Sequence, residues 1–361
     1  MSDFYYGKRV LVTGHTGFKG SWLCHILKSR GAIVTGFSLE PPTEPSLFKI
    51  ARIYEDMNSI IGDIRDYEAL RAAFRAAKPE IVFHLAAQPI VRESYKNPRY
   101  TYETNVIGTV NVLECIRIYG KVRSFLNVTT DKVYFNREWP WGYRENDPLD
   151  GFDPYSNSKS CSELVTGSFV RSYFNGGGTA VSTVRAGNVI GGGDFASDRI
   201  IPDCVRAALE SKSIFVRNPM SVRPYQHVLE ALFAYLMIAE MQYFDYKYSG
   251  SYNVGPDESD CVTTGELVQL FCEKWGGLNW ISRRDGGEHE ANFLKLDCSK
   301  IKQTFGWRPR WNIETAVEKT VEWFRCWQGG GDVQALMDEQ ALEYAEAINI
   351  GVKGEVMCLR V

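Results

Sequence analysis

The clearest chemistry in this sequence lies in the pair Tyr155 and Lys159, which stand four positions apart at the start of a segment with a helical pattern. That spacing places both side chains on one face of a helix. A free phenol has a pKa of about 10, and a neighbouring ammonium together with a cationic hydride acceptor favours the phenolate. Tyr155 can then take the proton of an alcohol while the carbon gives up a hydride. The pair therefore predicts a catalytic site for alcohol oxidation.

A second group of reactive side chains follows the β-branched run Arg123–Thr129. Thr130 offers a hydroxyl that can hydrogen-bond a reacting sugar hydroxyl, and Asp131 and Lys132 place an acid beside a potential base. On their own these residues would equally suit a turn closed by an ion pair. If the run is a strand of an α/β sheet, they lie at its carboxyl end, where ligands bind in such sheets.

A glycine-rich loop follows the first predicted strand, Lys8–Thr13, and precedes a helical pattern over Phe18–Arg30. Glycines at these spacings permit a tight turn and a close backbone approach to a pyrophosphate, while the helix directs its first N–H groups at the phosphates. The strand–loop–helix context is the one that a dinucleotide-binding motif requires. The predicted cofactor-binding residues of the loop are Gly14, His15, Thr16, Gly17, Phe18, Lys19 and Gly20.

Residues after the second and third predicted strands bear on the identity of the dinucleotide. The second strand ends near Ser38, with Glu40 two positions further on. An acid at this place bonds the ribose hydroxyls, and no arginine follows closely enough to hold a 2′-phosphate, so the sequence favours NAD over NADP. Asp63 and Ile64 follow the third strand, close to the adenine in such a fold. A solvated Glu40 and a turn-forming Asp63 are the alternatives.

Strands and helices alternate along the first half of the chain, which predicts an α/β fold with a Rossmann-like, doubly wound parallel sheet. Right-handed crossovers then place helices on both faces of that sheet. The predicted strands are Lys8–Thr13, Ala32–Leu39, Ser59–Ile64, Glu80–Ala86, Arg123–Thr129 and Thr179–Arg185, and the predicted helices are Phe18–Arg30, Asn97–Tyr119 and Pro154–Phe174.

The regular alternation of predicted strands and helices ends at about Gly187, after which glycine, proline and aromatic residues become frequent. We therefore expect residues 1–187 to form the NAD-binding domain, joined by about 226–255, and residues 188–328 to form mainly a smaller, mixed α/β substrate-binding lobe. Residues 329–361 are expected to be a linker, with a hinge at 329–331, and a helical tail with one amphipathic helix over Val333–Ile348.

Composition excludes several classes of function for the 361 residues. A net charge of -3 offers no electrostatic footprint for nucleic acid or an acidic membrane. The nine cysteines stand singly without a CxxC pair, which argues against a disulfide framework and against a metal site. The N-terminus lacks an apolar signal region, and no run approaches the roughly 18 apolar residues of a membrane span. We expect a soluble, cytoplasmic protein.

The combined motifs resemble the extended short-chain dehydrogenase/reductase family, over residues from about 8 to 310. The segments that carry the resemblance are Gly14–Gly20, His84–Gln88 (HLAAQ), Thr130 and the pair Tyr155 and Lys159. The segment Arg185–Asp194 (RAGNVIGGGD) is similar to the sugar-nucleotide branch of that family. Three runs, GHTGFKGSWL, TTDKVY and RPYQHVLE, resemble the 4,6-dehydratases of CDP-linked sugars.

This resemblance implies NAD as the cofactor, a CDP-linked hexose as the substrate and a reaction in three stages. C4 is oxidised as Tyr155 takes the hydroxyl proton, water leaves across C5 and C6, and hydride returns to C6. Lys159 supports Tyr155, and Asp131 resembles the general acid for the C6 hydroxyl. Lys132 stands where dTDP-glucose dehydratases have a glutamate base. An ammonium cannot accept a proton, so the base that acts on C5 stays open.

The resemblance also implies the binding residues. Further cofactor contacts fall on Leu85, Ala86, Ala87, Asn105 and Thr129, in addition to Tyr155 and Lys159. Substrate contacts fall on Gln88, Thr130, Asn188, Arg199, Arg223, Gln226 and His227. Arginine suits a diphosphate because its planar fork binds oxygens in pairs, although each of these residues alone would equally suit a structural role. His84 is interpreted as a core histidine, and Asp194 and Asp203 as loop and cap residues rather than metal ligands.

Two other functions fit part of the pattern. A sugar-nucleotide 4-epimerase shares the glycine loop, Tyr155 and Lys159, but has no need of an acid for a C6 hydroxyl. A non-catalytic NAD-binding regulator has no reason to keep the reactive residues together. The resemblance further implies a role in deoxysugar formation for a lipopolysaccharide O-antigen. It also implies a homodimer or homotetramer paired through the helices Asn97–Tyr119 and Pro154–Phe174.

Overall fold

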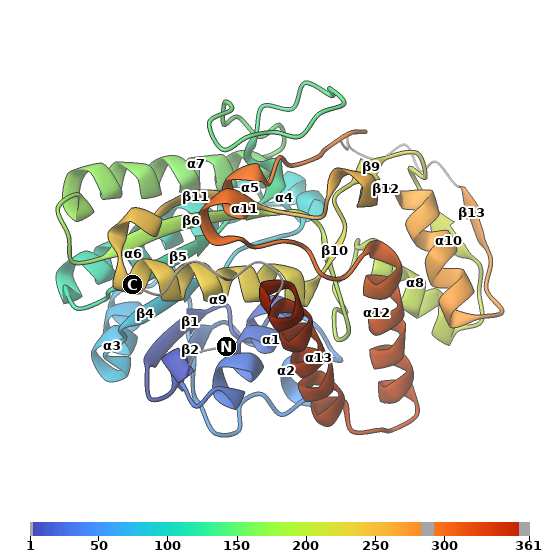
Figure 1. Ribbon diagram of the computed structural model, residues 1–361, viewed down its shortest axis with the longest axis horizontal. Helices are drawn as coiled ribbons and strands as arrows, with labels where there is room; N and C mark the ends of the chain where they lie inside the picture. The colour runs from blue at the N-terminus through green and yellow to red at the C-terminus, as the bar shows by residue number, and fades with distance from the viewer. Residues whose placement is uncertain (1–2, 283–291, 354–361) are drawn as a thin grey trace.

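The computed structural model describes residues 3–282 and 292–353. Its centre is a sheet of seven strands in the order β3-β2-β1-β4-β5-β6-β11, and every neighbouring pair is parallel (Figure 1). The strands are β1 (Arg9–Thr13), β2 (Ile33–Ser38), β3 (Asn58–Ile61), β4 (Ile81–His84), β5 (Ser124–Val128), β6 (Ala180–Ala186) and β11 (Gly250–Val254). The predicted Rossmann-like sheet is confirmed.

Helices cover both faces of this sheet because alternate residues of each strand enter different cores. One face carries α1 (Phe18–Ser29) and α9 (Val228–Phe244), and the other carries α3 (Tyr67–Ala77), α6 (Gly108–Tyr119) and α7 (Pro154–Phe169). In β1, Val10 and Val12 belong to the core that contains α1 and α9, whereas Leu11 belongs to the core that contains α3 and α6. The reactive segments therefore leave a sheet that is buried on both sides.

Two of the predicted helices contain π-helical turns. The predicted helix Asn97–Tyr119 consists of α5 (Pro98–Tyr102), the π-helical η2 (Glu103–Ile107) and α6. The predicted helix Pro154–Phe174 consists of α7 and the π-helical η4 (Val170–Phe174). Such turns often occur at functional sites, and η2 carries the predicted cofactor residue Asn105.

A smaller lobe of mixed structure lies to the right of the sheet in Figure 1. Its strands are β7 (Val189–Ile190), β8 (Ile214–Val216), β9 (Val222–Arg223), β10 (Gln226–His227), β12 (Val262–Thr263) and β13 (Trp280–Ser282), and its helices are α8 (Ile200–Leu209), α10 (Thr264–Trp275) and α12 (Ile313–Gln328). The helix α11 (Ser299–Phe305) instead packs on β11, at the edge of the central sheet. The strands form separate pairs, β7 with β10, β8 with β13 and β9 with β12. Helix α10 packs against α8 and α12.

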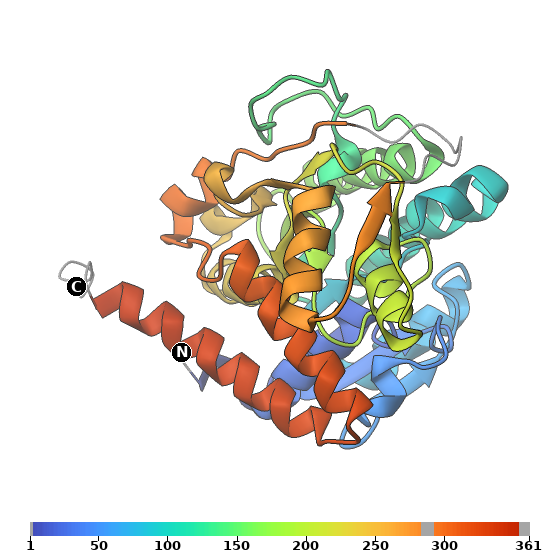
Figure 2. The ribbon, with the colours of Figure 1, turned by 90° about the vertical axis from the view of Figure 1, so that its right-hand side faces the viewer.

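The helix α13 (Val333–Lys353) lies across α1 and α12 (Figure 2). Tyr344 of α13 donates to the Glu230 carboxylate of α9 at 2.6 Å, and Asp338 contacts His25 of α1 at 2.8 Å. The predicted helix in this region is confirmed, while residues 354–361 of the predicted tail lie outside the described residues. Within the part of the chain that the structure describes, no helix has the length and apolar character needed to cross a membrane.

Short helices complete the chain. They are α2 (Leu47–Ile50), α4 (Val91–Lys96) and the 3-10 turns η1 (Asp3–Tyr5), η3 (Asp131–Val133), η5 (Tyr246–Tyr248) and η6 (Glu258–Asp260). The turn η3 matters most for the site, because it begins directly after β5 and holds Asp131 and Lys132 at the carboxyl end of the sheet.

Candidate active site

The three glycines of the loop before α1 have different packing environments. A Cβ on Gly14, whose φ is +77°, would lie 2.7 Å from the Ala86 nitrogen, and one on Gly20 would lie 2.1 Å from the Gly14 oxygen. The fold itself therefore requires these two glycines. A Cβ on Gly17 would meet nothing closer than 3.5 Å. Internal packing does not explain Gly17, which leaves an open surface at the start of α1.

The N-terminus of α1 is suited to a phosphate. Gly17 provides no side-chain cap, and the first turn contains no acidic residue. The first N–H groups of the helix thus keep their hydrogen-bonding capacity and the positive end of the helix dipole. An anion that approaches over Gly17 would be bound by both. The loop fits the pyrophosphate of a dinucleotide cofactor.

Two polar residues of the loop are turned toward the protein. The His15 ring bonds the Ser59 hydroxyl through Nε2 at 2.7 Å and packs so closely on Gly36 that a Cβ there would lie 2.2 Å from the ring. Burial lowers the pKa of His15 to about 4, so the ring is neutral at pH 7. The Thr16 hydroxyl lies 2.8 Å from that of Ser38. These contacts anchor the loop on β2 and β3, and direct cofactor contacts by His15, Thr16 and Ser38 stay predictions.

The predicted residues around the adenine end have mostly internal partners. Burial tends to raise the pKa of Asp63, but hydrogen bonds from Arg65 outweigh it and lower the pKa. Ile64 is buried against Gly108 of α6, where a Cβ would lie 2.4 Å from the Ile64 side chain. Glu40 is exposed. Cofactor contacts by Asp63 and Ile64 remain predictions.

The segment after β4 is held in place by side-chain hydrogen bonds. Asn105 accepts from the Gln88 backbone N–H at 2.9 Å and donates to the Gln88 carbonyl at 3.1 Å. The Gln88 side chain donates to Thr101 and accepts from the Ile90 N–H, so both of its polar ends have partners. These bonds hold the chain at Gln88, directly after the predicted cofactor residues Leu85, Ala86 and Ala87, whose cofactor contacts stay predictions.

His84, at the end of β4, is a core histidine as predicted. Its ring nitrogens lie 2.7 Å from the Thr13 hydroxyl and 3.1 Å from the Thr109 hydroxyl. Burial lowers its pKa to about 3, with the charge of Lys159 acting in the same direction. The neutral ring therefore links β1, β4 and α6 and carries no charge toward the site.

The predicted pair Tyr155 and Lys159 lies in the first turns of α7, which begins after the N-cap Asp153. Burial raises the pKa of Tyr155 to about 12, while contact with the Thr130 hydroxyl acts in the opposite direction. Burial lowers the pKa of Lys159 to about 8, and the charge of Glu163 opposes this shift. The Lys159 ammonium donates to the Val128 carbonyl at 3.0 Å, at the end of β5.

Asp131 is a fully buried carboxylate whose two oxygens differ in their hydrogen bonding. Its Oδ1 accepts from the Thr130 hydroxyl at 2.9 Å and contacts the Lys132 ammonium at 3.3 Å. Lys132 also donates to the Asn188 side chain at 3.1 Å. Asp131 Oδ2 has no hydrogen-bond partner among the described residues. Buried polar atoms usually have hydrogen-bond partners. We therefore infer that the partner of Asp131 Oδ2 is a polar group of the bound ligand.

A cavity of about 520 Å³ brings most of the predicted reactive residues together. Its size is in the range of small-molecule sites. The predicted residues along its wall are Lys19, Thr129, Thr130, Asp131, Lys132, Tyr155, Asn188, Arg199 and Arg223. Arg199 also binds Asp194 at 3.0 Å, which agrees with a loop role for Asp194. Asp203 lies within α8, whose N-cap is Arg199, and forms an ion pair with Arg206, so the predicted cap role of Asp203 is wrong.

Three predicted substrate residues do not line this cavity: Gln88, described above, Gln226 and His227. Gln226 donates to the Val254 carbonyl at 3.0 Å. His227 caps α9 by accepting from the Leu229 N–H and packs against Trp311, and burial lowers its pKa to about 3. The structure gives each of them a packing role, and direct substrate contact stays a prediction.

Lys19 also lines the cavity. The sequence predicted only a cofactor contact for this residue, and its place in the cavity wall was not predicted. Lys19 extends from the glycine loop into the cavity, with its ammonium 5.9 Å from the centre of the Tyr235 ring. Burial, together with the nearby charges of Arg199 and Lys159, lowers its pKa to about 7. A cation is disfavoured in the first turn of a helix, and that mismatch was the available signal.

Comparison with known proteins places the chain in a family. The model of the GDP-mannose 4,6 dehydratase family matches residues 11–320. The chain therefore belongs to the GDP-mannose 4,6 dehydratase family, within the extended short-chain dehydrogenases/reductases.

Individual relatives narrow the resemblance. The chain is 48% identical over 352 residues to the CDP-glucose 4,6-dehydratase of Salmonella typhimurium, covering 96% of this chain and 98% of that protein. It is 29% identical over 331 residues to the dTDP-glucose 4,6-dehydratase of Streptomyces antibioticus, covering 88% and 92% of the two chains.

Solved structures confirm the fold. The UDP-glucose 4-epimerase of Thermotoga maritima, solved with UDP-glucose, superposes with a TM-score of 0.77 at 25% identity over 88% of this chain and 99% of that chain. The dTDP-glucose 4,6-dehydratase of Bacillus anthracis, solved with NAD, has a TM-score of 0.74 at 22% identity over 91% and 100% of the two chains. Because an epimerase and a dehydratase match about equally well, the fold alone does not separate the two activities.

Proposed function

We propose that this protein converts CDP-D-glucose to CDP-4-keto-6-deoxy-D-glucose as an NAD-dependent 4,6-dehydratase, a hydro-lyase. The observation that carries the proposal is the buried Asp131 carboxylate, which lines the same cavity as Tyr155 and whose Oδ2 has no hydrogen-bond partner in the described part of the chain. Oxidation at C4 needs only a base, whereas loss of the C6 hydroxyl also needs an acid. The likeness to the Salmonella enzyme supports CDP-glucose as the substrate.

Bound NAD would supply the acceptor for the C4 hydride and the donor that returns it to C6. The open N-terminus of α1 and Gly17 would hold its pyrophosphate, and Lys159 its nicotinamide ribose. The positive charges of Lys19 and Arg199 at the cavity wall would attract the anionic substrate. A site that returns every hydride to the product consumes no cofactor overall.

The side chains divide the proton transfers. Tyr155 takes the C4 hydroxyl proton, and the Thr130 hydroxyl beside it orients that group. Asp131, when protonated, gives its proton to the departing C6 hydroxyl from Oδ2. Lys132 is held as a donor to both Asp131 and Asn188. That arrangement supports a role in orienting Asp131, while the base for C5 stays open.

Incubation with CDP-, dTDP-, UDP- and GDP-glucose tests the proposal. CDP-glucose should give a product lighter by one water, with catalytic NAD and no build-up of NADH. A product of unchanged mass would instead favour a 4-epimerase, which the likeness to the Thermotoga enzyme makes the second candidate. Absence of turnover with every nucleotide sugar would favour a non-catalytic NAD-binding protein.

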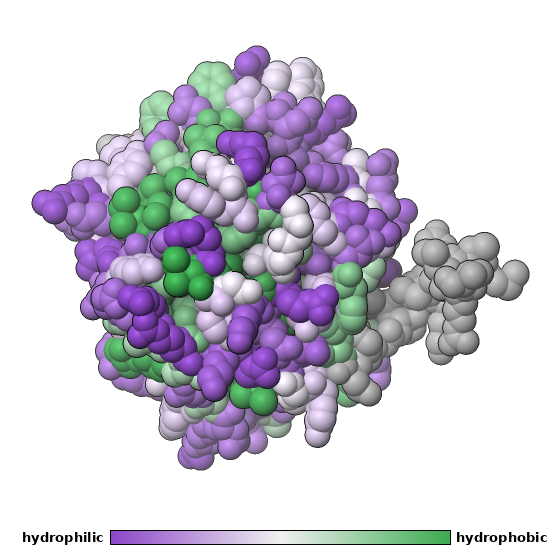
Figure 3. All heavy atoms as spheres, turned by 90° about the vertical axis from the view of Figure 1, so that its left-hand side faces the viewer, coloured by the Kyte–Doolittle hydropathy of each residue, from purple (hydrophilic) through white to green (hydrophobic). Residues whose placement is uncertain are grey.

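We further propose that α6 and α7 pair with their copies in a homodimer or homotetramer. Apolar side chains on these helices and the turns beside them are exposed, namely Ile107, Ile118, Leu164 and Tyr173. Figure 3 views the left side of Figure 1 and shows apolar groups among the hydrophilic ones on that face. Sedimentation analysis tests the assembly. A cytoplasmic location and supply of a deoxysugar for O-antigen stay predictions.

A further inference from the structure

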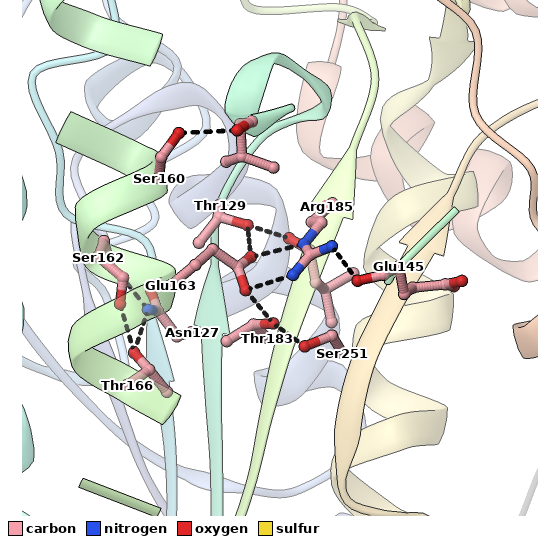
Figure 4. A network of polar contacts seen from close by, with 12 residues as sticks. Asn127, Thr129, Glu145, Ser160, Ser162, Glu163, Thr166, Thr183, Arg185 and Ser251 are labelled. Atoms are coloured by element: carbon pink, nitrogen blue, oxygen red, sulfur yellow. Dashed lines mark hydrogen bonds and ion pairs between the residues drawn. The ribbon is translucent and has the colours of Figure 1, made fainter. Parts of the chain in front are cut away.

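A second buried carboxylate, Glu163, projects from α7 toward Arg185 and the hydroxyls of Thr129 and Thr183 (Figure 4). Its oxygens accept two hydrogen bonds each. Oε1 accepts from the Arg185 Nε at 3.0 Å and the Thr129 hydroxyl at 2.5 Å, and Oε2 accepts from the Arg185 Nη2 at 2.9 Å and the Thr183 hydroxyl at 2.7 Å. Glu163 and Arg185 thus form a bidentate ion pair, in which both side chains are at most 3% exposed.

Arg185 extends this network away from α7. Its Nη1 donates to the Tyr134 hydroxyl and to the Glu145 carbonyl, both at 2.9 Å. Tyr134 in turn donates to the Asn253 side chain of β11 at 2.6 Å. The ion pair therefore connects α7 with β5, β6 and β11 and with the segment that follows Lys132. Few changes of Glu163 can leave the carboxyl end of β5 undisturbed.

The spacing along α7 relates this pair to the reactive residues. Glu163 lies one helical turn after Lys159, which lies one turn after Tyr155. Lys159 donates to the carbonyl of Val128, and Glu163 accepts from the side chain of the next residue, Thr129. Successive turns of α7 therefore hold successive residues at the end of β5. The residue after them is Thr130, whose hydroxyl lies beside Tyr155.

The charges around Lys159 give Glu163 a second effect. The titratable groups near Lys159 are Tyr155 and Glu163 on α7, His84 on β4 and Lys19 on α1, and the Arg185 cation of β6 is bound to the far side of Glu163. His84 is neutral, and Lys19 has the same sign as Lys159. Burial lowers the pKa of Lys159, and the carboxylate of Glu163 is the group that raises it. A buried ion pair adds little stability compared with apolar residues, so stability alone does not explain this one.

We propose that Glu163 is a positioning residue for the reaction: its carboxylate, fixed by Arg185 and Thr183, places a buried negative charge one helical turn from Lys159 and holds Thr129 and Thr130 against α7. The reaction meant is the one under the proposed function, on which this inference rests. The electrostatic part of the proposal concerns the pKa of Lys159 alone, and this pKa can be measured without a substrate.

The test is the titration of Lys159 in the Glu163→Gln variant. Lysine labelled at the side-chain carbon next to nitrogen is followed by NMR, and the Lys159 signal is identified by its loss in Lys159→Ala. The Lys159 midpoint should fall by about one pH unit, within the range that a lost counter-charge produces. The alkaline limb of the pH profile of kcat/KM should move down with it. An unchanged midpoint overturns the proposal.

Two matched variants separate charge from structure. Thr183→Val removes one hydrogen bond to the carboxylate but keeps its charge, so stability should fall while the Lys159 midpoint stays. Glu163→Asp should keep most of the wild-type midpoint. A midpoint that moves as far in Thr183→Val as in Glu163→Gln would show a packing effect and would overturn the electrostatic role.

Loss of the partner charge can prevent Glu163→Gln from folding, because it leaves Arg185 buried and unpaired. The double variant Glu163→Gln with Arg185→Gln removes both charges, and the Lys159 midpoint should still fall, by less. No fall in this folded variant also overturns the proposal. An enzyme inactive on every nucleotide sugar would remove the proposed function, yet the NMR titration would still decide the link between Glu163 and Lys159.

Discussion

Two buried carboxylates lie near the predicted catalytic pair, Glu163 on α7 itself and Asp131 in η3, and their surroundings differ. Glu163 has four donors on its two oxygens and an arginine partner that is 3% exposed. Asp131 leaves Oδ2 without a partner among the described residues, and its lysine neighbour is 29% exposed. A satisfied carboxylate holds structure, whereas an unsatisfied one at a cavity awaits a ligand. Changes at the first should mainly lower stability, and changes at the second should mainly lower turnover.

The largest loss of activity is expected for Tyr155→Phe, which serves as the reference for both carboxylates. Without the phenol oxygen, turnover should fall by at least the 10²–10⁴-fold that is typical of a missing acid–base group, while NAD binding stays close to normal. Lys159→Ala should lower both. The double variant should be far from additive, because the two residues act as one unit. Simple additivity in steady-state kinetics would contradict the assignment.

Asp131→Asn sharpens the comparison, since it keeps the size of the side chain but removes its ability to give a proton, together with the negative charge beside Lys132. Turnover should fall by about 10²–10⁴-fold, with a melting temperature equal to or above that of the wild type, because unsatisfied catalytic groups often cost stability. C4 oxidation should still occur. A single turnover with CDP-glucose should therefore accumulate bound NADH, visible by absorbance. A slow variant without NADH would instead give Asp131 a role before hydride transfer, and the epimerase hypothesis would gain ground.

Arg185→Met should have the opposite effect to Asp131→Asn, a large loss of stability with a small loss of turnover. It leaves Glu163 buried without its partner, and breaking such a pair typically costs about 3–5 kcal/mol of folding free energy. Denaturant unfolding should show this loss, whereas turnover per folded molecule should fall much less than in Asp131→Asn. A matched control is Arg144→Met, which breaks an exposed ion pair with Asp297 and should cost about 1 kcal/mol or less. Equal losses in both variants would contradict a structural role for the buried pair.

The smallest expected effect concerns pH. The pKa of Lys159 is lowered to about 8, so its ammonium is present below that pH and lost above it. Affinity for NAD should decline as pH rises through about 8, if the ammonium holds the ribose. Lys159→Arg stays charged in this range and should remove that decline. Fluorescence titration of NAD at several pH values measures both, and the same decline in the arginine variant would rule out Lys159 as its source.

Local patterns in the sequence predicted six of the seven strands of the central sheet, but not β11. The glycine loop and the Tyr155–Lys159 pair are recognised by spacing alone, and the roles assigned to them stay predictions. Partners from distant segments were not predictable. Gln226 bonds the carbonyl of Val254, and Glu163 pairs with Arg185 across a helix and a strand. A pattern marks such residues as polar and does not tell whether their partner is protein or ligand. Lys19 was identified as a loop residue, but its reach into the cavity depends on the tertiary fold.

Gly17 has a consequence for genetics and engineering. Because its missing side chain leaves room that the protein does not use, Gly17→Ala should fold and assemble normally yet exclude the dinucleotide. Such an allele would separate the presence of the protein from its activity, which a deletion cannot do. Changes at Gly14 or Gly20 would confound the two, since the chain itself would have to shift. A cell carrying the Gly17 variant would thus reveal whatever the folded protein does without its chemistry.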